Sequence, residues 1–381
     1  MFTTKNNQKP SLAIVTEGLR RDNQNPLQYF DQIKILHFYN FSPYGAETKK
    51  DFLGAIKFKS AWDLYERLVQ VKPDIIQGPE PYGSKKMFSY CIASYFAAKK
   101  LHIPLIFPFW ENRPAKKRFN FFQRVIVNWF AKKYLNFAQL IIYLNQGALK
   151  NIKALGIKDE SKLVKFLWGT YGVDTNEFYP RESNKSTGFH DKVILYVGRL
   201  DYEKGIKYLL LAFLKVHKRF PNAKLIFIGD GNQASFIKDF RIKYKLENKI
   251  ILKGLIANRD LPIYFQHATI FASPSITIDK WEEQVGMTNL QAMSSGVPVV
   301  STISGGIPEY VPNKIAGLLV PERDPDRLAG AMLSLLDNDK LRTRISRQAR
   351  VYALENYDAK DNVLKAQKLV LDLLKNINKN E

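Results

Sequence analysis

The sequence predicts an α/β protein made of two halves, each a doubly wound parallel sheet of the Rossmann-like kind. Its 381 residues are enough for two domains of ordinary size. Short apolar runs rich in β-branched residues alternate with amphipathic stretches along the chain, which is the pattern of parallel strands joined by helical crossovers. A polar segment at 178–191, containing proline, arginine, serine and glycine, indicates a join between the halves.

Each predicted strand is a short apolar run, and each predicted helix repeats apolar residues three and four positions apart. In the first half, 1–178, the strands cover residues 12–15, 33–39, 75–77, 105–108 and 140–144, and the helices cover 60–71, 84–100, 118–136 and 146–155. In the second half, 179–358, the strands cover residues 193–197, 224–228, 250–252, 269–272, 297–301 and 317–320, and the helices cover 205–219, 232–245, 260–267, 288–295 and 325–337.

Composition favours a folded protein of a reducing compartment. Hydrophobic residues make up 45% of the chain and aromatic residues 13%, which supports packed cores rather than disorder. The single cysteine, Cys91, lies in an apolar run and has no partner for an internal disulfide. Residues 1–9 are polar, unlike a secretory signal, and no run approaches the roughly 20 apolar residues of a membrane span. We therefore expect a cytoplasmic location.

A basic turn follows the strand at 193–197. Gly198 ends the strand, Arg199 and Lys204 follow on a short loop, and a helix begins near Gly205. A helix N-terminus offers oriented N–H groups, and the two cations add charge, so the arrangement is suited to gripping phosphates. The alternative is an ordinary surface loop that happens to be basic.

A second informative segment covers residues 273–309. It contains Glu283, followed eight positions later by Gln291, then Gly-Val-Pro-Val-Val at 296–300 and Gly-Gly-Ile-Pro-Glu at 305–309. Together with the Gly-Arg-Leu and Glu-Lys-Gly pieces of the first turn, it resembles family 4 of the retaining, nucleotide-sugar-dependent glycosyltransferases (glycosyl transferases group 1). The resemblance runs from about Val193 to Glu309.

The resemblance implies the GT-B fold, with two Rossmann-like domains facing a central cleft. The first domain, 1–178, would bind the acceptor, and the second, 179–358, would bind the donor. A final helix within 359–381 would cross back to the first domain. The implied reaction is metal-independent transfer of a hexose, with retention, from a nucleoside diphosphate sugar. The expected acceptor is a lipid-linked or cell-envelope glycan, and no cofactor is expected.

The resemblance also implies roles for individual residues. Arg199 and Lys204 would neutralise the diphosphate leaving group, and Glu283 would lie against the transferred sugar unless it is simply a solvated carboxylate. The donor-binding residues would be Gly198, Arg199, Lys204, Gly229, Glu283, Gly286, Met287, Thr288, Asn289 and Gln291.

Gln291 departs from the family pattern, which has a second glutamate that accepts hydrogen bonds from the ribose. An amide keeps one acceptor oxygen and replaces the other with a donor. Loss of a charge-assisted bond corresponds to about 1–2 kcal/mol.

The acceptor side of the first half matches the family less well. Gly18 belongs to a short Thr-Glu-Gly-Leu-Arg segment in place of a glycine-rich loop, and Trp110 stands about where the family has a histidine. Glu111 or Asn112 is a candidate to contact the acceptor or the sugar, and the alternative is that Trp110 is a core residue that caps the cleft.

Net charge points to an anionic partner. The chain carries a formal charge of +22, and no acidic residue occurs between Glu111 and Asp159. Docking on an anionic membrane surface is favoured, at the inner face of the cytoplasmic membrane, through Lys116, Lys117, Arg118 and Arg124. The alternatives are an ordinary solvated face over a core helix, in which Phe122, Val125, Ile126, Trp129 and Phe130 form the core stripe, and nucleic-acid binding.

Two other functions remain open at this point. A sugar-nucleotide epimerase of the same architecture would convert the donor without an acceptor, and a non-catalytic basic protein would bind membrane or nucleic acid through residues 113–133. The glycine-containing turn at 229–234 also fits a loose dinucleotide fingerprint, but such a match alone is weak.

Overall fold

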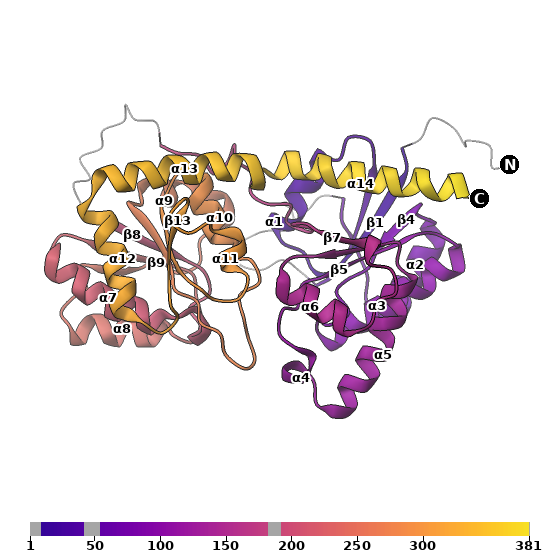
Figure 1. The fold of residues 1–381 in the computed structure, drawn as a ribbon, viewed down its shortest axis with the longest axis horizontal. Helices are drawn as coiled ribbons and strands as arrows, with labels where there is room; N and C mark the ends of the chain where they lie inside the picture. The colour runs from indigo at the N-terminus through magenta and orange to yellow at the C-terminus, as the bar shows by residue number, and fades with distance from the viewer. Residues whose placement is uncertain (1–8, 42–53, 182–191, 381) are drawn as a thin grey trace. The chain divides into compact units, whose positions relative to one another are not determined.

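The computed structural model describes residues 9–41, 54–181 and 192–380 and divides the chain into two compact units (Figure 1). Unit 1 consists of Met1–Tyr171 and Ala359–Glu381, and unit 2 of Gly172–Asp358. The expected boundary at residue 178 lies later than the observed one. Residues 172–178 belong to unit 2 because the Val173 amide donates to the Tyr357 carbonyl (2.8 Å) and Arg350 donates to the Phe178 carbonyl (3.0 Å).

Unit 1 contains a parallel sheet in the order β3-β2-β1-β4-β5-β6-β7. Its strands are β1 (Ser11–Gly18), β2 (Lys34–Phe41), β3 (Ile56–Lys57), β4 (Ile75–Gln77), β5 (Leu105–Phe109), β6 (Leu140–Tyr143) and β7 (Leu163–Lys165). Its helices are α1 (Arg21–Gln24), α2 (Ala61–Val71), α3 (Lys85–Leu101), α4 (Ala115–Arg118), α5 (Phe121–Phe137), α6 (Gln146–Ala154) and α14 (Ala359–Asn380), with 3₁₀ turns η1 (Asn25–Tyr29) and η3 (Glu160–Lys162). The two edge strands β3 and β7 are absent from the sequence prediction.

Side chains of β1 alternate between two cores, one on each face of the sheet. Ala13 and Val15 pack with α2, α3, α5 and α6, whereas Leu12 and Ile14 pack with η1 and α14. α14 contributes Val363, Ala366 and Val370 to the second core. Gln367 fixes the helix there, because its side chain accepts from the Gln32 amide (2.8 Å). The C-terminal helix is therefore part of unit 1.

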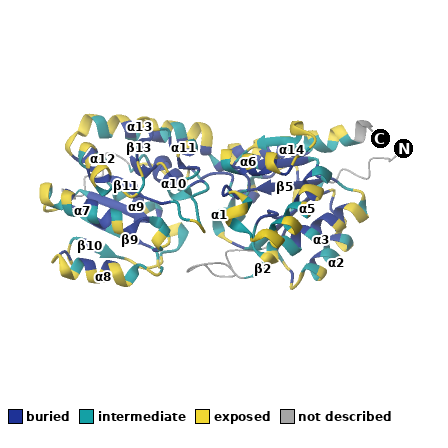
Figure 2. Ribbon diagram, turned by 60° about the horizontal axis from the view of Figure 1, so that its bottom comes forward, coloured by how far each residue is buried: buried dark blue, intermediate teal, exposed yellow. Residues whose placement is uncertain are grey.

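Unit 2 contains a second parallel sheet, in the order β10-β9-β8-β11-β12-β13. Its strands are β8 (Val193–Val197), β9 (Lys224–Ile228), β10 (Ile250–Leu252), β11 (Ile270–Ser273), β12 (Val299–Thr302) and β13 (Gly317–Val320). Its helices are α7 (Ile206–Arg219), α8 (Ala234–Lys243), α9 (Pro262–His267), α10 (Met287–Ser294), α11 (Ile307–Tyr310), α12 (Pro325–Asp337) and α13 (Asp339–Tyr357), with 3₁₀ turns η4 (Tyr202–Lys204) and η5 (Asn258–Asp260). The strands are buried and the outward faces of α7, α8 and α12 are exposed (Figure 2).

The predicted helix at 118–136 is wrong in two respects. It is interrupted at Phe119 and Asn120, where the Asn120 side chain caps α5 by accepting from the Gln123 amide (2.9 Å). Its expected core stripe is also exposed: Phe122, Val125, Ile126 and Trp129 face solvent, and only Phe130 is half-buried. The side of α5 that meets the core is formed by Ala131, Tyr134 and Leu135. Within the described residues, no helix is long and apolar enough to cross a membrane.

Candidate functional site

The strand order of unit 2 reverses between β8 and β11. The chain runs from β8 to β9 and β10 on one side, and then places β11, β12 and β13 on the other. In open parallel sheets, ligands bind at the carboxyl ends of the two strands that flank such a reversal. The basic turn follows β8 and the segment that contains Glu283 follows β11, so both lie at this position.

The turn after β8 is fixed by close backbone contacts. Gly205 has φ +69°, and a Cβ added there would lie 1.8 Å from the Pro274 carbonyl oxygen. Only glycine permits this approach, which brings the start of α7 against the loop after β11. Gly198 and Gly229 end β8 and β9, and the Gly198 amide donates to the Ile228 carbonyl (3.0 Å).

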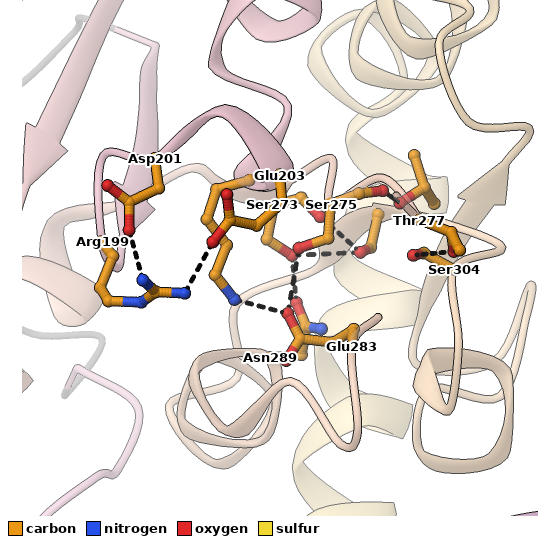
Figure 3. A network of polar contacts seen from close by, with 12 residues as sticks. Arg199, Asp201, Glu203, Ser273, Ser275, Thr277, Glu283, Asn289 and Ser304 are labelled. Atoms are coloured by element: carbon orange, nitrogen blue, oxygen red, sulfur yellow. Dashed lines mark hydrogen bonds and ion pairs between the residues drawn. The ribbon is translucent and has the colours of Figure 1, made fainter. Parts of the chain in front are cut away.

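Arg199 points away from the core and is held by two carboxylates of its own turn (Figure 3). Its Nη2 lies 2.9 Å from Glu203 Oε1, and its Nη1 pairs with Asp201. The side chain is 58% exposed, so it is available to an incoming anion. The buried Tyr196 hydroxyl donates to the Arg199 carbonyl (2.6 Å) and anchors the turn, and burial raises the pKa of Tyr196 well above its usual value.

Lys204 and Glu283 form an ion pair. Lys204 Nζ lies 2.8 Å from Glu283 Oε2, which also accepts a hydrogen bond from Ser275 Oγ (3.0 Å) (Figure 3). The ammonium group also lies over the Trp281 ring, 4.3 Å from its centroid. Both charged side chains are mostly buried, with 17% and 14% exposed, so this pair is screened less by solvent than a surface pair.

The glycine pair at 305–306 holds the Glu283 backbone. The Gly306 amide donates to the Glu283 carbonyl (2.8 Å). Gly305 has φ +51°, and a Cβ there would lie 2.1 Å from the same carbonyl oxygen. The Gly-Gly-Ile-Pro-Glu turn thus fixes the backbone of the loop that carries Glu283.

The start of α10 carries four of the expected donor-binding residues, Gly286, Met287, Thr288 and Asn289. Gly286 precedes the helix, and the Asn289 amide donates to the Gly286 carbonyl (2.8 Å), so this amide is already used within the turn. The Asn289 side chain is buried and accepts from Ser273 Oγ (2.5 Å). The helix begins at Met287, one residue before the predicted start at 288, so Met287 and Thr288 both lie in its first turn.

Gln291 is buried in α10, with 8% of its surface exposed. Its Nε2 donates to Asn258 Oδ1 (3.3 Å) in η5. Among the described residues, its buried Oε1 has no hydrogen-bond partner. A buried carbonyl oxygen without a partner is costly, so this atom is suited to accept a hydrogen bond from a ligand.

Sequence reasoning missed Trp281 and Ser275, although both lie in the segment that it singled out. It also missed Glu322, after β13, which accepts from Thr277 Oγ1 (2.7 Å) and from the Thr277 amide (2.8 Å). Nothing in the spacing of these residues signals contact, because they come together only when β11 and β13 join the same sheet.

The acceptor candidates of unit 1 gather after β1 and β5. Gly18 ends β1, and a Cβ there would lie 2.6 Å from the Phe41 ring. Glu111 is 5% exposed and its carboxylate is bound by Arg113, with Nη2 2.6 Å from Oε2 and Nε 2.8 Å from Oε1. The expected contact between Glu111 and the acceptor is therefore disfavoured, because its carboxylate is already part of an internal ion pair.

Trp110 and Asn112 flank Glu111 in the segment that follows β5, where Trp110 is half-buried and Asn112 is buried. The Trp110 amide donates to the carboxylate of Glu80 (2.9 Å), as does the amide of Glu111. Asn112 is 8% exposed and packs against Gly147. Burial and the nearby charge of Glu111 raise the pKa of Glu80 to about 7, which sequence reasoning did not anticipate.

The expected basic face needs one correction. Arg118 turns inward, donating to the carbonyls of Tyr82 (2.5 Å) and Gly83 (2.8 Å) and lying 3.3 Å from Glu111 Oε2. It is therefore structural rather than part of a surface. Lys116 and Lys117 are exposed, and Arg124 is half-buried with its guanidinium 5.7 Å from the Phe121 ring centroid. Across the described ranges, no group of three or more histidine, cysteine, aspartate or glutamate residues is arranged to hold a metal ion.

Comparisons with known proteins find similarity to glycosyltransferases. Residues 180–352 match the family model "Glycosyl transferases group 1". An uncharacterized glycosyltransferase of Methanocaldococcus jannaschii, MJ1607, is 32% identical over 167 residues, covering 43% of this chain and 41% of the relative. The alpha-monoglucosyldiacylglycerol synthase of Streptococcus pneumoniae is 26% identical over 253 residues, which cover 61% of this chain and 54% of that relative. The chain thus spans about half the length of the curated relatives that it matches.

A solved structure shares the fold. The crystal structure of Anabaena Alr3699/HepE in complex with UDP-glucose superimposes with a TM-score of 0.74 at 18% identity, covering 95% of this chain and 99% of that one. The two parallel sheets with flanking helices are those of the GT-B architecture.

Proposed function

Because unit 2 is a domain of the group 1 glycosyltransferases in a chain of GT-B architecture, we propose that the protein is a retaining, metal-independent glycosyltransferase. It takes a hexose from a nucleoside diphosphate sugar and passes it to a lipid-linked or cell-envelope glycan. The observation that carries this proposal is the ion pair between Lys204 and Glu283 across the strand reversal of the sheet in unit 2, with Arg199 on the same turn as Lys204.

The two cations suit a diphosphate leaving group. As the bond from the sugar to the phosphate breaks, negative charge grows on the departing oxygen, and fixed positive groups lower the barrier. Arg199 is exposed and is paired with two carboxylates of its own turn, which a diphosphate can replace. Lys204 is preoriented by Glu283 and Trp281. Two such cations supply charge that other enzymes draw from a bound metal ion.

Glu283 suits the binding of the sugar. Its Oε2 is held by Lys204 and Ser275. A carboxylate fixed in this way is better suited to accept hydrogen bonds from sugar hydroxyls than to attack the anomeric carbon as a nucleophile. Retention would then follow from departure of the diphosphate and arrival of the acceptor on the same face of the sugar. The buried Oε1 of Gln291 would accept from a ribose hydroxyl.

The lipid-linked acceptor is supported by one relative. The alpha-monoglucosyldiacylglycerol synthase of S. pneumoniae is named for a glycolipid product. The buried, unpaired thiol of Cys91 fits a reducing compartment, so we place the reaction at the inner face of the cytoplasmic membrane.

The test begins with a thermal-shift panel of nucleoside diphosphates on the full chain. A ligand that binds only the folded state raises Tm, and at a fixed ligand concentration the shift grows with the logarithm of the affinity. The best donor is then incubated with and without glycolipid acceptors, and both the products and their anomeric configuration are identified. Conversion of donor alone to an isomeric sugar nucleotide would establish an epimerase, and the absence of any shift would contradict the site.

A further inference from the structure

One face of α5 is apolar and exposed. Five large side chains are involved, and their exposed fractions far exceed those of core residues: Phe121 64%, Phe122 78%, Val125 54%, Ile126 55% and Trp129 59%. Single exposed apolar residues are common on proteins, but clusters on one element mark interaction sites. The core of unit 1 therefore leaves this face uncovered.

These side chains share one side of the helix. Their positions follow the spacing i, i+1, i+4, i+5 and i+8, which at 3.6 residues per turn occupies an arc of about 140°. The opposite side carries Ala131 and Tyr134, which are buried in the unit. The first turns of α5 extend away from the sheet, and α4 lies beside them (Figure 1).

Exposed lysines lie on α4 and near the end of α5, on either side of the apolar face along the chain. Lys116 and Lys117 are exposed on α4, and Lys132 and Lys133 are exposed near the end of α5. Lys133 Nζ lies 5.1 Å from the centroid of the Trp129 ring. No acidic residue occurs between Glu111 and Asp159. A helix face that is apolar in its middle and has lysines towards both ends is complementary to anionic headgroups above acyl chains.

We propose that the exposed face of α5 docks on an anionic lipid bilayer, with the helix lying in the plane of the interface. Phe121, Phe122 and Trp129 enter the headgroup region, and the lysines remain at the phosphate level. The proposal goes beyond glycosyl transfer, because it assigns a lipid surface to a face that carries none of the candidate donor residues.

Two other occupants fit this face less well. A second copy paired through the same face by a two-fold axis would bring the same lysines together with no opposing carboxylate on α4 or α5. A nucleic acid uses aromatic rings for stacking and cations for phosphates, but it leaves aliphatic side chains such as Val125 and Ile126 without a partner.

The experiment is co-flotation of the full chain with vesicles. We expect binding to vesicles of phosphatidylcholine with phosphatidylglycerol, and much weaker binding to phosphatidylcholine alone, since each cation near the surface adds about fivefold in affinity. Binding should weaken as salt is raised. The variant Phe122→Ser/Trp129→Ser should lower partitioning by at least tenfold, because it removes two large apolar groups from the interface. Lys116→Gln/Lys117→Gln should lower it by about tenfold or more.

Matched controls distinguish binding through this face from non-specific binding to vesicles. Trp62→Ser removes an equally exposed tryptophan, 67% exposed on α2, and should leave partitioning unchanged. Lys218→Gln/Lys238→Gln removes two exposed lysines of unit 2 and should have little effect. Circular dichroism verifies that each variant is folded.

The proposal fails if the α5 variants bind vesicles as the wild type does, or if their controls lose binding equally. It also fails if vesicles are not bound and sedimentation shows a dimer that Phe122→Ser/Trp129→Ser dissociates, or if a single-stranded oligonucleotide is bound through this face instead. Because these measurements need no donor or acceptor, their outcome is independent of the proposed glycosyl transfer.

Discussion

Lys204 and Glu283 are 79 residues apart in the sequence, yet Lys204 Nζ lies 2.8 Å from Glu283 Oε2. The contact joins the turn after β8 to the loop after β11, on either side of the strand reversal. It means that the cation expected to meet the diphosphate and the carboxylate expected to meet the sugar are already neighbours before a donor arrives.

Removing either cation should abolish most of the transfer. Arg199→Ala and Lys204→Ala are each expected to lower kcat by at least ~100-fold, because each removes a positive group that faces charge developing on the leaving oxygen. Initial rates with saturating donor check this expectation. Lys207→Ala, which removes an exposed lysine on the next turn of the chain, is the matched control and should retain the wild-type rate. Wild-type rates in both cation variants would remove these residues from the site.

Trp281 should act as a positioning residue for Lys204. Its ring lies 4.3 Å from the ammonium group, a contact worth about 1 kcal/mol at a partly buried site. Trp281→Leu is therefore expected to lower kcat/KM about fivefold, with Trp281→Phe keeping most of the activity. A purely structural role would instead lower Tm equally in both variants, so paired Tm measurements decide between the two explanations.

Gln291 offers a gain-of-affinity test. In Gln291→Glu, a full negative charge replaces the amide whose Oε1 now lacks a partner, and a charge-assisted bond to ribose should tighten nucleoside diphosphate binding by about tenfold. Gln291→Leu should weaken it. Isothermal titration calorimetry measures both variants, and identical Kd values for Gln291→Glu and the wild type would argue against a ribose contact.

Glu80 should make the stability of unit 1 depend on pH. Burial raises the pKa of this carboxyl from 4.5 to about 7, so the folded state holds a proton that the unfolded chain has released. The free energy of unfolding is therefore highest below pH 4.5, where Glu80 is protonated in both states. It falls by about 3 kcal/mol as pH rises towards 7. Glu80→Gln, neutral at all pH values, should become the more stable protein by this amount near pH 8.

The measurement uses urea denaturation in a Trp281→Phe background. The four remaining tryptophans, Trp62, Trp110, Trp129 and Trp168, all lie in unit 1, so their fluorescence reports on that unit. Glu66→Gln, at an exposed position of α2, is the control. A difference between Glu80→Gln and the wild type that stays constant from pH 4 to 8 would show that folding does not shift the pKa of Glu80.

Local patterns could predict most of the regular structure. The apolar runs at 193–197, 224–228 and 250–252 are the observed strands β8, β9 and β10, because buried parallel strands must be almost wholly apolar. The helix α13 was not predicted. It is strongly charged and buries only Ile345, Ala349, Ala353 and Tyr357, a stripe too narrow to signal a helix by periodicity.

For the candidate site, the sequence predicted which residues take part but not the contacts between them. The resemblance to the glycosyltransferase family implied that Arg199, Lys204 and Glu283 act together. The ion pair between Lys204 and Glu283 and the Trp281 ring beneath the ammonium depend on how separate loops meet, and the internal hydrogen bond of the Asn289 backbone amide depends on the turn that starts α10. The same limit applies to Arg118, whose basic character suggested a surface residue but whose guanidinium binds Glu111 and two carbonyls inside unit 1.

The amino-acid sequence by itself determined the alternation of strands and helices, the two parallel sheets and the basic turn after the first strand of unit 2. These features follow from local backbone preference and from the period of apolar residues. Tertiary structure alone decided which charges are paired and which apolar faces are covered. The stripe on α5 has the spacing of a core helix, and it is a surface because no element of the described part of the chain covers it. Periodicity records that a helix has an apolar side, whereas burial depends on what the rest of the chain places against it.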